Sequence, residues 1–325
     1  MNAVITGVGG YVPDYILTND ELSHMVDTDD EWIMSRIGIK KRHILKEKGK
    51  GTSYMATKAV KQLLAKTKTL PQDVDLIMVA TSTPDHPLPS TASLICEELE
   101  LKNAFAFDVE AACSGFLYLM EVAAAFISLG RYKKIVIVGA DKMSAIINYT
   151  DRSTCPIFSD GAAAFMIEPG CSLGIIDSFL RTDGFGFPYL NVKSGGSAFP
   201  ISPETINSGS QYLHQDGKTV FKYAVLNMTS ACNEIMARNN LNIENIDWVV
   251  PHQANVRIID AIAQNLRIDK HKVLINIEEF GNTSAATLPL CIWYYENQLK
   301  KGDNLIFTAF GAGFCWGAIY VKWGY

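Results

Sequence analysis

The sequence has little that would direct the chain into a membrane, out of the cell or onto nucleic acid. No apolar run approaches the roughly 18 residues that cross a bilayer, and residues 1–7 lack the basic stretch of a signal peptide. Acidic residues (34) outnumber basic ones (29), and the only local basic cluster lies within residues 40–50. Nucleic acid is therefore not the expected main partner. We expect a soluble, cytoplasmic protein that does not insert into membranes.

The sequence also lacks paired cysteines. Its seven cysteines form no Cys-x-x-Cys motif. An odd number of cysteines without a secretion signal argues against a disulfide framework or a structural zinc site. We expect no metal and no bound cofactor. Most of the cysteines should be small buried apolar residues, with at most one or two involved in chemistry.

What the sequence does contain is a large share of apolar residues. The chain has 325 residues, of which 48% are apolar. This length is too great for one comfortable single-core domain. The composition alone leaves two alternatives open, namely two packed units of about 150 residues each or one duplicated unit.

A comparison of the chain with itself favours the duplication. Three pairs of segments share a nearly constant spacing along the chain. We therefore divide the chain into an N-terminal half, residues 1–172, and a C-terminal half, residues 173–325. The paired segments are residues 75–80 and 247–252, residues 135–138 and 305–308, and two strand-to-helix corners at Cys113 and Asn282.

The order of the patterns along the chain predicts the α/β class. Short apolar runs rich in Val and Ile are typical of strands that are buried on both faces. Alternating strands and helices imply mixed sheets covered by helices, one sheet per half. Insertions at residues 141–157 and 182–218 are where we expect specificity to reside. The predicted strands include residues 4–8, 76–79, 135–138, 248–250 and 305–308, and the predicted helices are residues 53–66, 114–129, 221–239 and 284–300.

Cys113 is the first candidate for chemistry. It follows a predicted strand and lies at the first turn of an apolar helix, between small residues that leave its sulfur accessible. The positive end of the helix dipole favours the thiolate and hence a nucleophilic sulfur. Taken alone, a cysteine is more often a buried structural residue.

His252 and Asn282 are the second and third candidates. His252 directly follows the strand at residues 248–250, and ligands bind at such strand ends in α/β sheets. Asn282 occupies the duplicate position of Cys113, where it could cap its own helix or donate a hydrogen bond to a developing oxyanion. The small residues of the turn at 310–314 would let backbone N–H groups approach a carbonyl oxygen. By the pseudo-symmetry, both helix N-termini should point toward one central cavity.

Four motifs stand in a characteristic order along the chain. They are Asp29-Asp30-Glu31-Trp32-Ile33 with Arg36, Gly38-Ile39 and Arg42-His43; Ala111-Ala112-Cys113-Ser114-Gly115-Phe116; Pro251-His252-Gln253-Ala254-Asn255 with Arg257-Ile258; and Gly281-Asn282-Thr283-Ser284-Ala285-Ala286. In this order and spacing they resemble the β-ketoacyl-acyl carrier protein synthase III family, over essentially the whole chain. The resemblance implies a thiolase-like fold, in which two pseudo-symmetric α/β halves form a five-layered α-β-α-β-α sandwich.

The resemblance also implies a reaction. Cys113 would take an acyl group from acyl-CoA, helped by its own backbone N–H and the turn at residues 311–313. Malonyl-acyl carrier protein would then enter, and His252 and Asn282 would donate hydrogen bonds to its thioester oxygen, stabilising the enolate left by decarboxylation. The enolate carbon would attack the acyl-cysteine and give 3-oxoacyl-acyl carrier protein, which starts fatty acid biosynthesis. This role needs a neutral His252, which suits a desolvated site.

The resemblance assigns further contacts. Trp32 and Arg152 resemble the pair that encloses the adenine of CoA. Leu88 stands where a Phe of some members gates the acyl pocket across a homodimer interface, and Ala312 replaces the middle residue of a glycine turn. The other expected CoA contacts are Thr28, Arg36, Gly217, Phe221 and Asn255, and the expected contacts with the acyl carrier protein are Lys222, Gln253 and Arg257.

Two other functions stay open at this point. A thiolase-fold acyltransferase, or a condensing enzyme of specialised metabolism, would use the same acylated Cys113 on another acceptor. Asn282 argues against simple acyl transfer, because that reaction has no enolate to stabilise. A non-catalytic partner that only binds acyl carriers would be expected to lack the nucleophile, and Cys113 is present.

Overall fold

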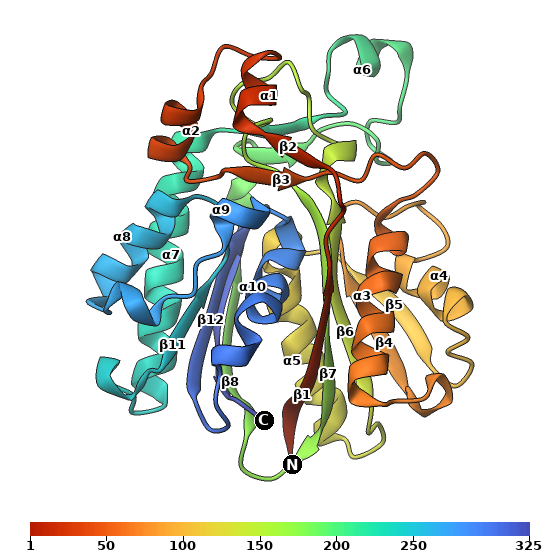
Figure 1. Ribbon diagram of the computed structural model, residues 1–325, viewed down its shortest axis with the longest axis vertical. Helices are drawn as coiled ribbons and strands as arrows, with labels where there is room; N and C mark the ends of the chain where they lie inside the picture. Colours follow the sequence, from red (N-terminus) through yellow and green to blue (C-terminus); the bar gives the residue numbers. More distant parts are fainter.

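Two sets of strands enclose a pair of central helices, α5 (Gly115–Ser128) and α10 (Thr287–Tyr295), as Figure 1 shows. The structure is a computed structural model that describes residues 1–325. Further helices cover the outer face of each strand set, so the layers follow the order helix, strand set, helix, strand set, helix. This order confirms the predicted five layers. The outer helices are α3 (Thr52–Thr67) and α4 (Thr91–Glu98) on one side, and α7 (Gly217–Arg238) and α8 (Val256–Leu266) on the other.

The strands of the two sets follow mirror-image orders about the centre of the molecule. The predicted strands are all present, with longer bounds. In spatial order, the nine strands are β5 (Phe105–Val109), β4 (Leu76–Ala80), β6 (Ile135–Lys142), β7 (Asp160–Gly170), β1 (Asn2–Tyr11), β8 (Gly174–Thr182), β13 (Cys315–Lys322), β12 (Asn304–Gly311) and β11 (Trp248–Pro251).

Strands β1 and β8 join the two sets. They pair antiparallel at one position, Ala3 opposite Ile175, and these two residues are as far apart in the sequence as positions 75 and 247. Because these two edge strands bring their unpaired backbone groups together, the strands form one nine-stranded sheet and not the separate sheet per half that we expected. A parallel bridge between Val249 and Val273 continues the C-terminal set beyond β11. The mirror-image order supports the division into residues 1–172 and 173–325, which we retain as a proposal.

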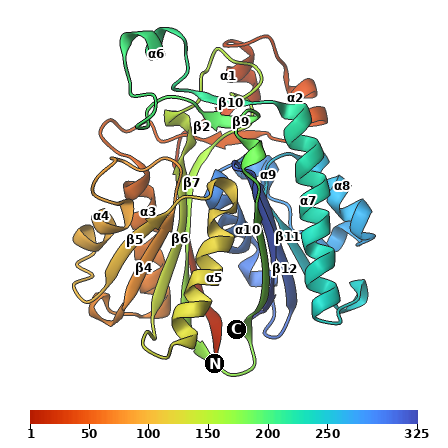
Figure 2. The same cartoon turned by 180° about the vertical axis from the view of Figure 1, so that it is seen from behind.

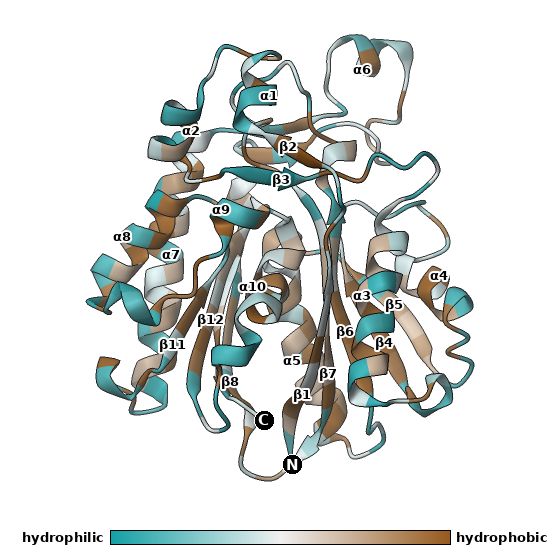
Figure 3. Cartoon of the chain, in the orientation of Figure 1, coloured by the Kyte–Doolittle hydropathy of each residue, from teal (hydrophilic) through white to brown (hydrophobic).

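Three clusters of buried apolar residues fill the spaces between the layers. The largest surrounds α5 and α10 between the strand sets, and the other two lie under α3 with α4 and under α7 with α8. All five positions of β4 are buried, as expected for a strand covered on both faces. Phe116 and Phe165 meet edge to face with ring centroids 4.9 Å apart, a geometry worth about 1 kcal/mol. Figure 3 shows hydrophobic strands inside and hydrophilic outer helix faces.

A smaller layer covers one end of the strands. It combines the segment after β1 with the two predicted insertions, and Figures 1 and 2 show it at the top of the molecule. Its own apolar cluster includes Leu22, Ile33 and Phe158. The elements of this layer are β2 (Ile16–Thr18), α1 (Asn19–Ser23), α2 (Asp30–Arg36), β3 (Lys41–His43), β9 (Leu190–Val192), α6 (Pro203–Asn207) and β10 (Leu213–Gln215).

Side-chain caps fix where three helices of the site begin. The Asp29 carboxylate accepts from Trp32 N at 2.7 Å at the start of α2. Asp216 caps α7 by accepting from Thr219 N, and Asn255 caps α8. Each such cap contributes about 1 kcal/mol to helix stability. The caps therefore set the register of helices that carry several predicted CoA and carrier contacts.

Two properties of the whole chain complete the description. None of its helices is both long and apolar enough to cross a membrane. Nowhere do three or more His, Cys, Asp or Glu side chains gather in an arrangement that could hold a metal ion.

Candidate active site

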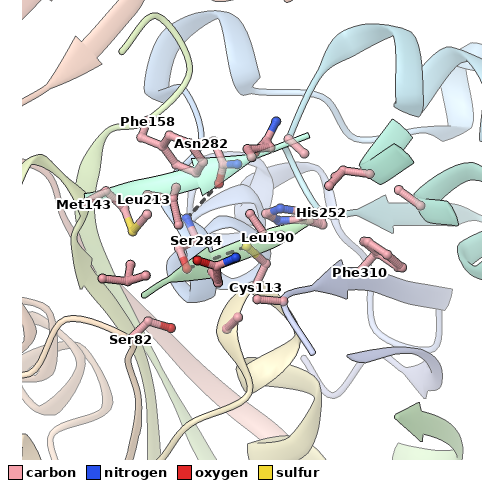
Figure 4. A pocket seen from close by; sticks show the side chains of 18 of the residues that line it. Ser82, Cys113, Met143, Phe158, Leu190, Leu213, His252, Asn282, Ser284 and Phe310 are labelled. Carbon is pink, nitrogen blue, oxygen red and sulfur yellow. Dashed lines mark hydrogen bonds between the residues drawn. The ribbon is translucent and has the colours of Figure 1, made fainter. Parts of the chain in front are cut away.

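The three candidate residues line one cavity of about 270 Å³. Cys113 comes from the first half of the chain, and His252 and Asn282 come from the second. Figure 4 shows their side chains around the same space, together with Ser284. Fifteen of the 22 lining residues are apolar, so the polar groups in the cavity meet little water. The expectation of a shared central cavity is confirmed.

The backbone before Cys113 has an unusual conformation. Cys113 lies in the 3₁₀ turn Ala112–Ser114, between β5 and α5. Ala112 has a φ of 45°, in the left-handed region that costs a non-glycine residue about 1 kcal/mol or more. This sharp turn leads directly into α5, and the sulfur contacts the Ser284 hydroxyl at 3.7 Å.

Burial dominates the acidity of Cys113. It raises the pKa of the thiol to about 12, and the negative charge of Asp141 acts in the same direction. The hydrogen bond with Ser284 lowers the pKa in part. The helix start favours the thiolate, but burial acts in the opposite direction and keeps the thiol protonated in the protein without substrate. The thiol must lose its proton during the reaction.

The turn between β12 and β13 lies against the start of α5. A Cβ atom on Gly311 would stand 2.8 Å from Cys113 N and 3.1 Å from Ser114 N. Only glycine lets the turn approach the Cys113 amide this closely. Ala312 lines the cavity, so the methyl group that departs from the family pattern faces the site.

His252 is held at the end of β11 by its backbone and its ring. Its amide donates to Thr308 O at 2.8 Å, and Nδ1 lies 2.6 Å from the Thr287 hydroxyl. The ring makes its hydrogen bond within the chain through Nδ1 and not through the other nitrogen, Nε2. Burial lowers the pKa of His252 to about 3. The imidazole is therefore neutral at pH 7, as the predicted role requires.

Asn282 is fixed by its backbone on one side and by its carboxamide on the other. Its amide donates to Ile157 O at 3.0 Å, and its carbonyl accepts from Ser159 N at 2.9 Å. The side-chain Oδ1 accepts from Ser284 N at 2.9 Å. This bond uses Oδ1 and leaves the Nδ2 amino group as a donor in the lining of the cavity. Asn282 does not cap α10.

The structural counterpart of Cys113 is Ala285 and not Asn282. The 3₁₀ turn before α10 spans Ser284–Ala286, and it follows the turn Ala112–Ser114 at the same spacing that separates positions 75 and 247. Ser284 has the same left-handed conformation as Ala112, with a φ of 53°. The duplication had paired Cys113 with Asn282, which lies three residues before the true counterpart, Ala285. The error arose because the spacing between matching elements is not constant. It is shorter for β6 and β12 than for β4 and β11, since the loops of the two halves differ in length.

Several predicted CoA contacts lie near one another. The Arg152 guanidinium stacks over the Trp32 ring at 4.5 Å, and it lies 3.9 Å from the Asp27 carboxylate. Val256 N donates to Ile37 O, which joins the end of α2 to the start of α8. Of the remaining predicted contacts, Thr28 lies just before α2 and Arg36 at its end, and the others lie at the starts of α7 and α8, namely Gly217, Phe221 and Asn255.

One predicted carrier contact is wrong. Gln253 is 1% exposed, and its amide donates to Pro251 O and Leu274 O while Oε1 accepts from Asn276 N. All its polar groups serve the packing of the chain, so it cannot meet another protein. Lys222 and Arg257 are exposed, and Arg257 lies over the Phe221 ring at 5.6 Å.

Sequence reasoning missed three polar residues behind the site. Ser284 contacts the Cys113 sulfur and orients Asn282, and Thr287 contacts His252. Asp141 is fully buried and accepts from Ser82 N, Ala285 N and the hydroxyls of Thr81 and Thr83. These hydroxyl residues were visible in the sequence, but nothing in it shows that Ser284 meets Cys113 of the other half or that Thr287 meets His252.

The depressed pKa of His252 makes a prediction about stability. Between about pH 6.5 and pH 3 the unfolded chain binds a proton that the folded His252 does not, so stability falls as the pH falls. From pH 7 to pH 5 this costs about 2 kcal/mol of unfolding free energy. Between pH 7 and pH 5, urea unfolding should therefore show that the wild type loses about 2 kcal/mol more unfolding free energy than His252→Gln loses. Equal losses in the two proteins would contradict the assignment.

Comparisons with known proteins agree with this geometry. A profile of 3-oxoacyl-[acyl-carrier-protein] synthase III matches residues 107–184, and one of its C-terminal part matches residues 236–323. The chain is 67% identical to beta-ketoacyl-[acyl-carrier-protein] synthase III 1 of Bacteroides thetaiotaomicron (100% of this chain, 97% of that protein) and 65% identical to the synthase III of Phocaeicola vulgatus (100% and 98%). The crystal structure of 3-oxoacyl-[acyl-carrier-protein] synthase III from Aquifex aeolicus superposes with a TM-score of 0.91 at 39% identity, covering 99% of this chain and 100% of that one. The chain belongs to the β-ketoacyl-[acyl-carrier-protein] synthase III family of thiolase-fold condensing enzymes.

Proposed function

We propose that this protein condenses an acyl-CoA with malonyl-acyl carrier protein, releasing CO₂ and forming 3-oxoacyl-acyl carrier protein at the start of fatty acid biosynthesis. The observation that carries the proposal is the meeting of Cys113, His252 and Asn282 in one mostly apolar cavity. Membership of the synthase III family supports the same reaction. A cytoplasmic location stays a prediction.

The first half-reaction acylates Cys113. The sulfur attacks the thioester carbon of acyl-CoA, the bond from that carbon to the CoA sulfur breaks, and the thiol proton ends on CoA. Because burial raises the pKa of Cys113, the proton leaves as the new bond forms. The Cys113 amide and the Gly311–Gly313 turn lie where backbone donors would stabilise the oxyanion.

The second half-reaction uses the other two residues. Loss of CO₂ from the malonyl group moves an electron pair toward the thioester oxygen, where Asn282 and the neutral His252 supply hydrogen bonds. The resulting carbon nucleophile attacks the acyl-cysteine, and the Cys113 sulfur leaves and regains a proton. The apolar lining supports this step, because hydrogen bonds to a developing charge are strongest away from water.

The exposed cations beside the site support the proposed substrates. Arg152 stacks on Trp32 in this structure, and the two would enclose a flat heteroaromatic base such as adenine once the exposed arginine moves away from the ring. Lys222 and Arg257 are exposed at the starts of α7 and α8, where they would meet an acidic carrier protein.

The Trp32 and Arg152 pair makes a prediction about the affinity for acyl-CoA. Arg152→Ala removes a stacking interaction of about 1 kcal/mol, so KM for acyl-CoA should rise roughly five- to tenfold. The turnover number should change little, because Arg152 does not contact the reacting atoms. Steady-state kinetics would show this, with Arg131→Ala as the control, since Arg131 stacks on Tyr132 outside the cavity. Equal KM values in the two variants would contradict the assignment.

We also propose that the protein acts as a homodimer. Strand β5 is an edge strand of the sheet, with Phe105 40% exposed. Phe105 lies beside Phe107, Phe126 and Tyr132, and such an apolar edge favours pairing with a second copy. Leu88 is 85% exposed and does not line its own cavity, which fits a gate residue that reaches another subunit. A sedimentation mass of one chain would contradict the dimer.

One incubation tests the proposed function. With an acyl-CoA and malonyl-acyl carrier protein, the protein should release CO₂ and form the 3-oxoacyl product. An acyltransferase that works on an alcohol or amine would release no CO₂ from the malonyl thioester. A non-catalytic binding partner would leave the Cys113 peptide without an acyl group in the mass spectrum. Either result would overturn the proposal.

A further inference from the structure

The Thr287 hydroxyl lies between two hydrogen-bond partners deep in the protein, His252 Nδ1 and Ser284 O. Thr287 is 2% exposed at the first residue of α10. Its Oγ1 is 2.6 Å from His252 Nδ1 and 3.1 Å from Ser284 O. A hydroxyl carries only one proton. If that proton points to Nδ1, the imidazole proton must be on Nε2, and if it points to Ser284 O, the imidazole proton must be on Nδ1.

The two distances favour the bond between the hydroxyl and His252. Hydroxyl donors to oxygen give contacts of about 2.5–3.0 Å. The 3.1 Å contact with Ser284 O is longer than this range, whereas Nδ1 lies 2.6 Å from the same hydroxyl. We therefore assign the hydroxyl proton to the shorter contact, in which Nδ1 accepts.

We propose that Thr287 is a positioning residue that holds the neutral His252 in the tautomer with its proton on Nε2. The ring hydrogen-bonds within the chain through Nδ1 and lines the cavity, so an N–H on Nε2 is free to meet a bound carbonyl oxygen. The inference rests on the proposed function, because the tautomer matters only if His252 donates to the thioester oxygen of the malonyl group. It goes further by naming the residue that makes His252 a donor.

The same short segment also orients the second donor. Ser284 N binds Asn282 Oδ1 and leaves the Nδ2 amino group toward the cavity. Ser284 thus orients the Asn282 amide and Thr287 the His252 ring, and both residues are almost fully buried. Their exclusion from water means that neither hydrogen bond is exchanged readily for one to solvent.

Two substitutions distinguish the effect of the Thr287 hydroxyl from the effect of the side chain's shape. Thr287→Val is nearly isosteric and removes the hydroxyl, whereas Thr287→Ser keeps it. In the Val variant the Nδ1 atom has no donor, so the proton distributes over both ring nitrogens. Thermal unfolding of all three proteins shows whether the Val variant is folded, and near-equal melting temperatures make its other measurements interpretable.

Nitrogen NMR of protein labelled with ¹⁵N-histidine tests the tautomer directly. Protonated and unprotonated ring nitrogens have well-separated chemical shifts, and His252→Gln identifies the His252 signals by their loss. We expect the proton on Nε2 in the wild type and in Thr287→Ser, and a mixture in Thr287→Val. A proton on Nδ1 in the wild type would overturn the proposal, whatever the activity of the protein.

The two half-reactions give the second readout. Release of CO₂ from malonyl-acyl carrier protein should fall roughly 10- to 100-fold in kcat for Thr287→Val, and the Ser variant should restore it. The KM for malonyl-acyl carrier protein and the rate of Cys113 acylation should stay within about threefold of the wild type. Equal loss of both half-reactions would indicate a general structural role and overturn the proposal. A wild type that condenses nothing would instead contradict the proposed function, while the NMR result would still decide the tautomer.

Discussion

Replacing Cys113 with alanine is expected to abolish acylation of the protein and to lower condensation by about 10³-fold or more. The sulfur is the atom that carries the acyl group between the two substrates, and no neighbouring side chain can take its place. The other cysteines of the chain lie outside the lining of the cavity. Mass spectrometry after incubation with acyl-CoA should show one acyl group on wild-type protein and none on Cys113→Ala.

Cys171 offers a matched control. It is the one exposed cysteine of the seven and lies in the turn between β7 and β8. Cys171→Ala should keep both the acylation and the rate of condensation. If Cys113→Ala still formed the 3-oxoacyl product at the wild-type rate, the proposed nucleophile would be wrong. Acylation of the Cys113→Ala protein at another residue would place the acyl group elsewhere and contradict the same assignment.

The sequence predicted the fold because its patterns are local and repeated. Runs such as residues 135–138 are apolar at every position, and only strands covered on both faces need such runs. The junction of the two strand sets was not predictable, because it depends on one residue pair, Ala3 and Ile175, between strands with no pairing signal. The spacing that identified the duplication also misplaced Asn282 by three residues, since loop lengths shift the alignment of the halves.

The sequence predicted that three residues share one cavity, as the structure shows, but it did not predict the electrostatics around them. Cys113, His252 and Asn282 were identified from motifs and from their places beside strands and helix starts. The pKa of the thiol was misjudged, because the sequence shows the helix start but not the depth of burial. Gln253 was wrongly predicted to contact the carrier protein for a related reason. The sequence does not show whether a polar residue beside a site faces a partner or hydrogen-bonds to the backbone behind the site, as Gln253 does.

The neighbours of the reactive groups come from distant parts of the chain. Asp141, Ser284 and Thr287 are ordinary polar residues in the sequence, and only the packing of the two halves brings the distant Ser284 to Cys113. These contacts show that the division at residues 172 and 173 does not separate two independent sites. The lining of the cavity needs both halves, so we expect neither half alone to acylate.

Replacing Asn282 with aspartate is expected to lower release of CO₂ from malonyl-acyl carrier protein by about 10²- to 10³-fold, the usual cost of losing an oxyanion donor. Aspartate has the same shape and keeps an oxygen for Ser284 N. It replaces the Nδ2 amino group by an oxygen, so a donor to the developing enolate becomes an acceptor or a negative charge. Acylation of Cys113 should persist, because that step develops its charge at a different oxygen.

The comparison of Asn282→Asp with Asn276→Asp separates catalysis from stability. Asn276 is buried to the same degree, 4% exposed, but does not line the cavity. Both changes bury a carboxyl group, so both should destabilise the fold, and only Asn282→Asp should slow decarboxylation strongly. The test compares two rates in the three proteins, CO₂ release and Cys113 acylation. Both rates are measured at one temperature below the unfolding transitions, so that differences in stability do not enter. If Asn276→Asp lost CO₂ release as completely as Asn282→Asp, or if Asn282→Asp kept it, Asn282 would not be the donor that stabilises the enolate.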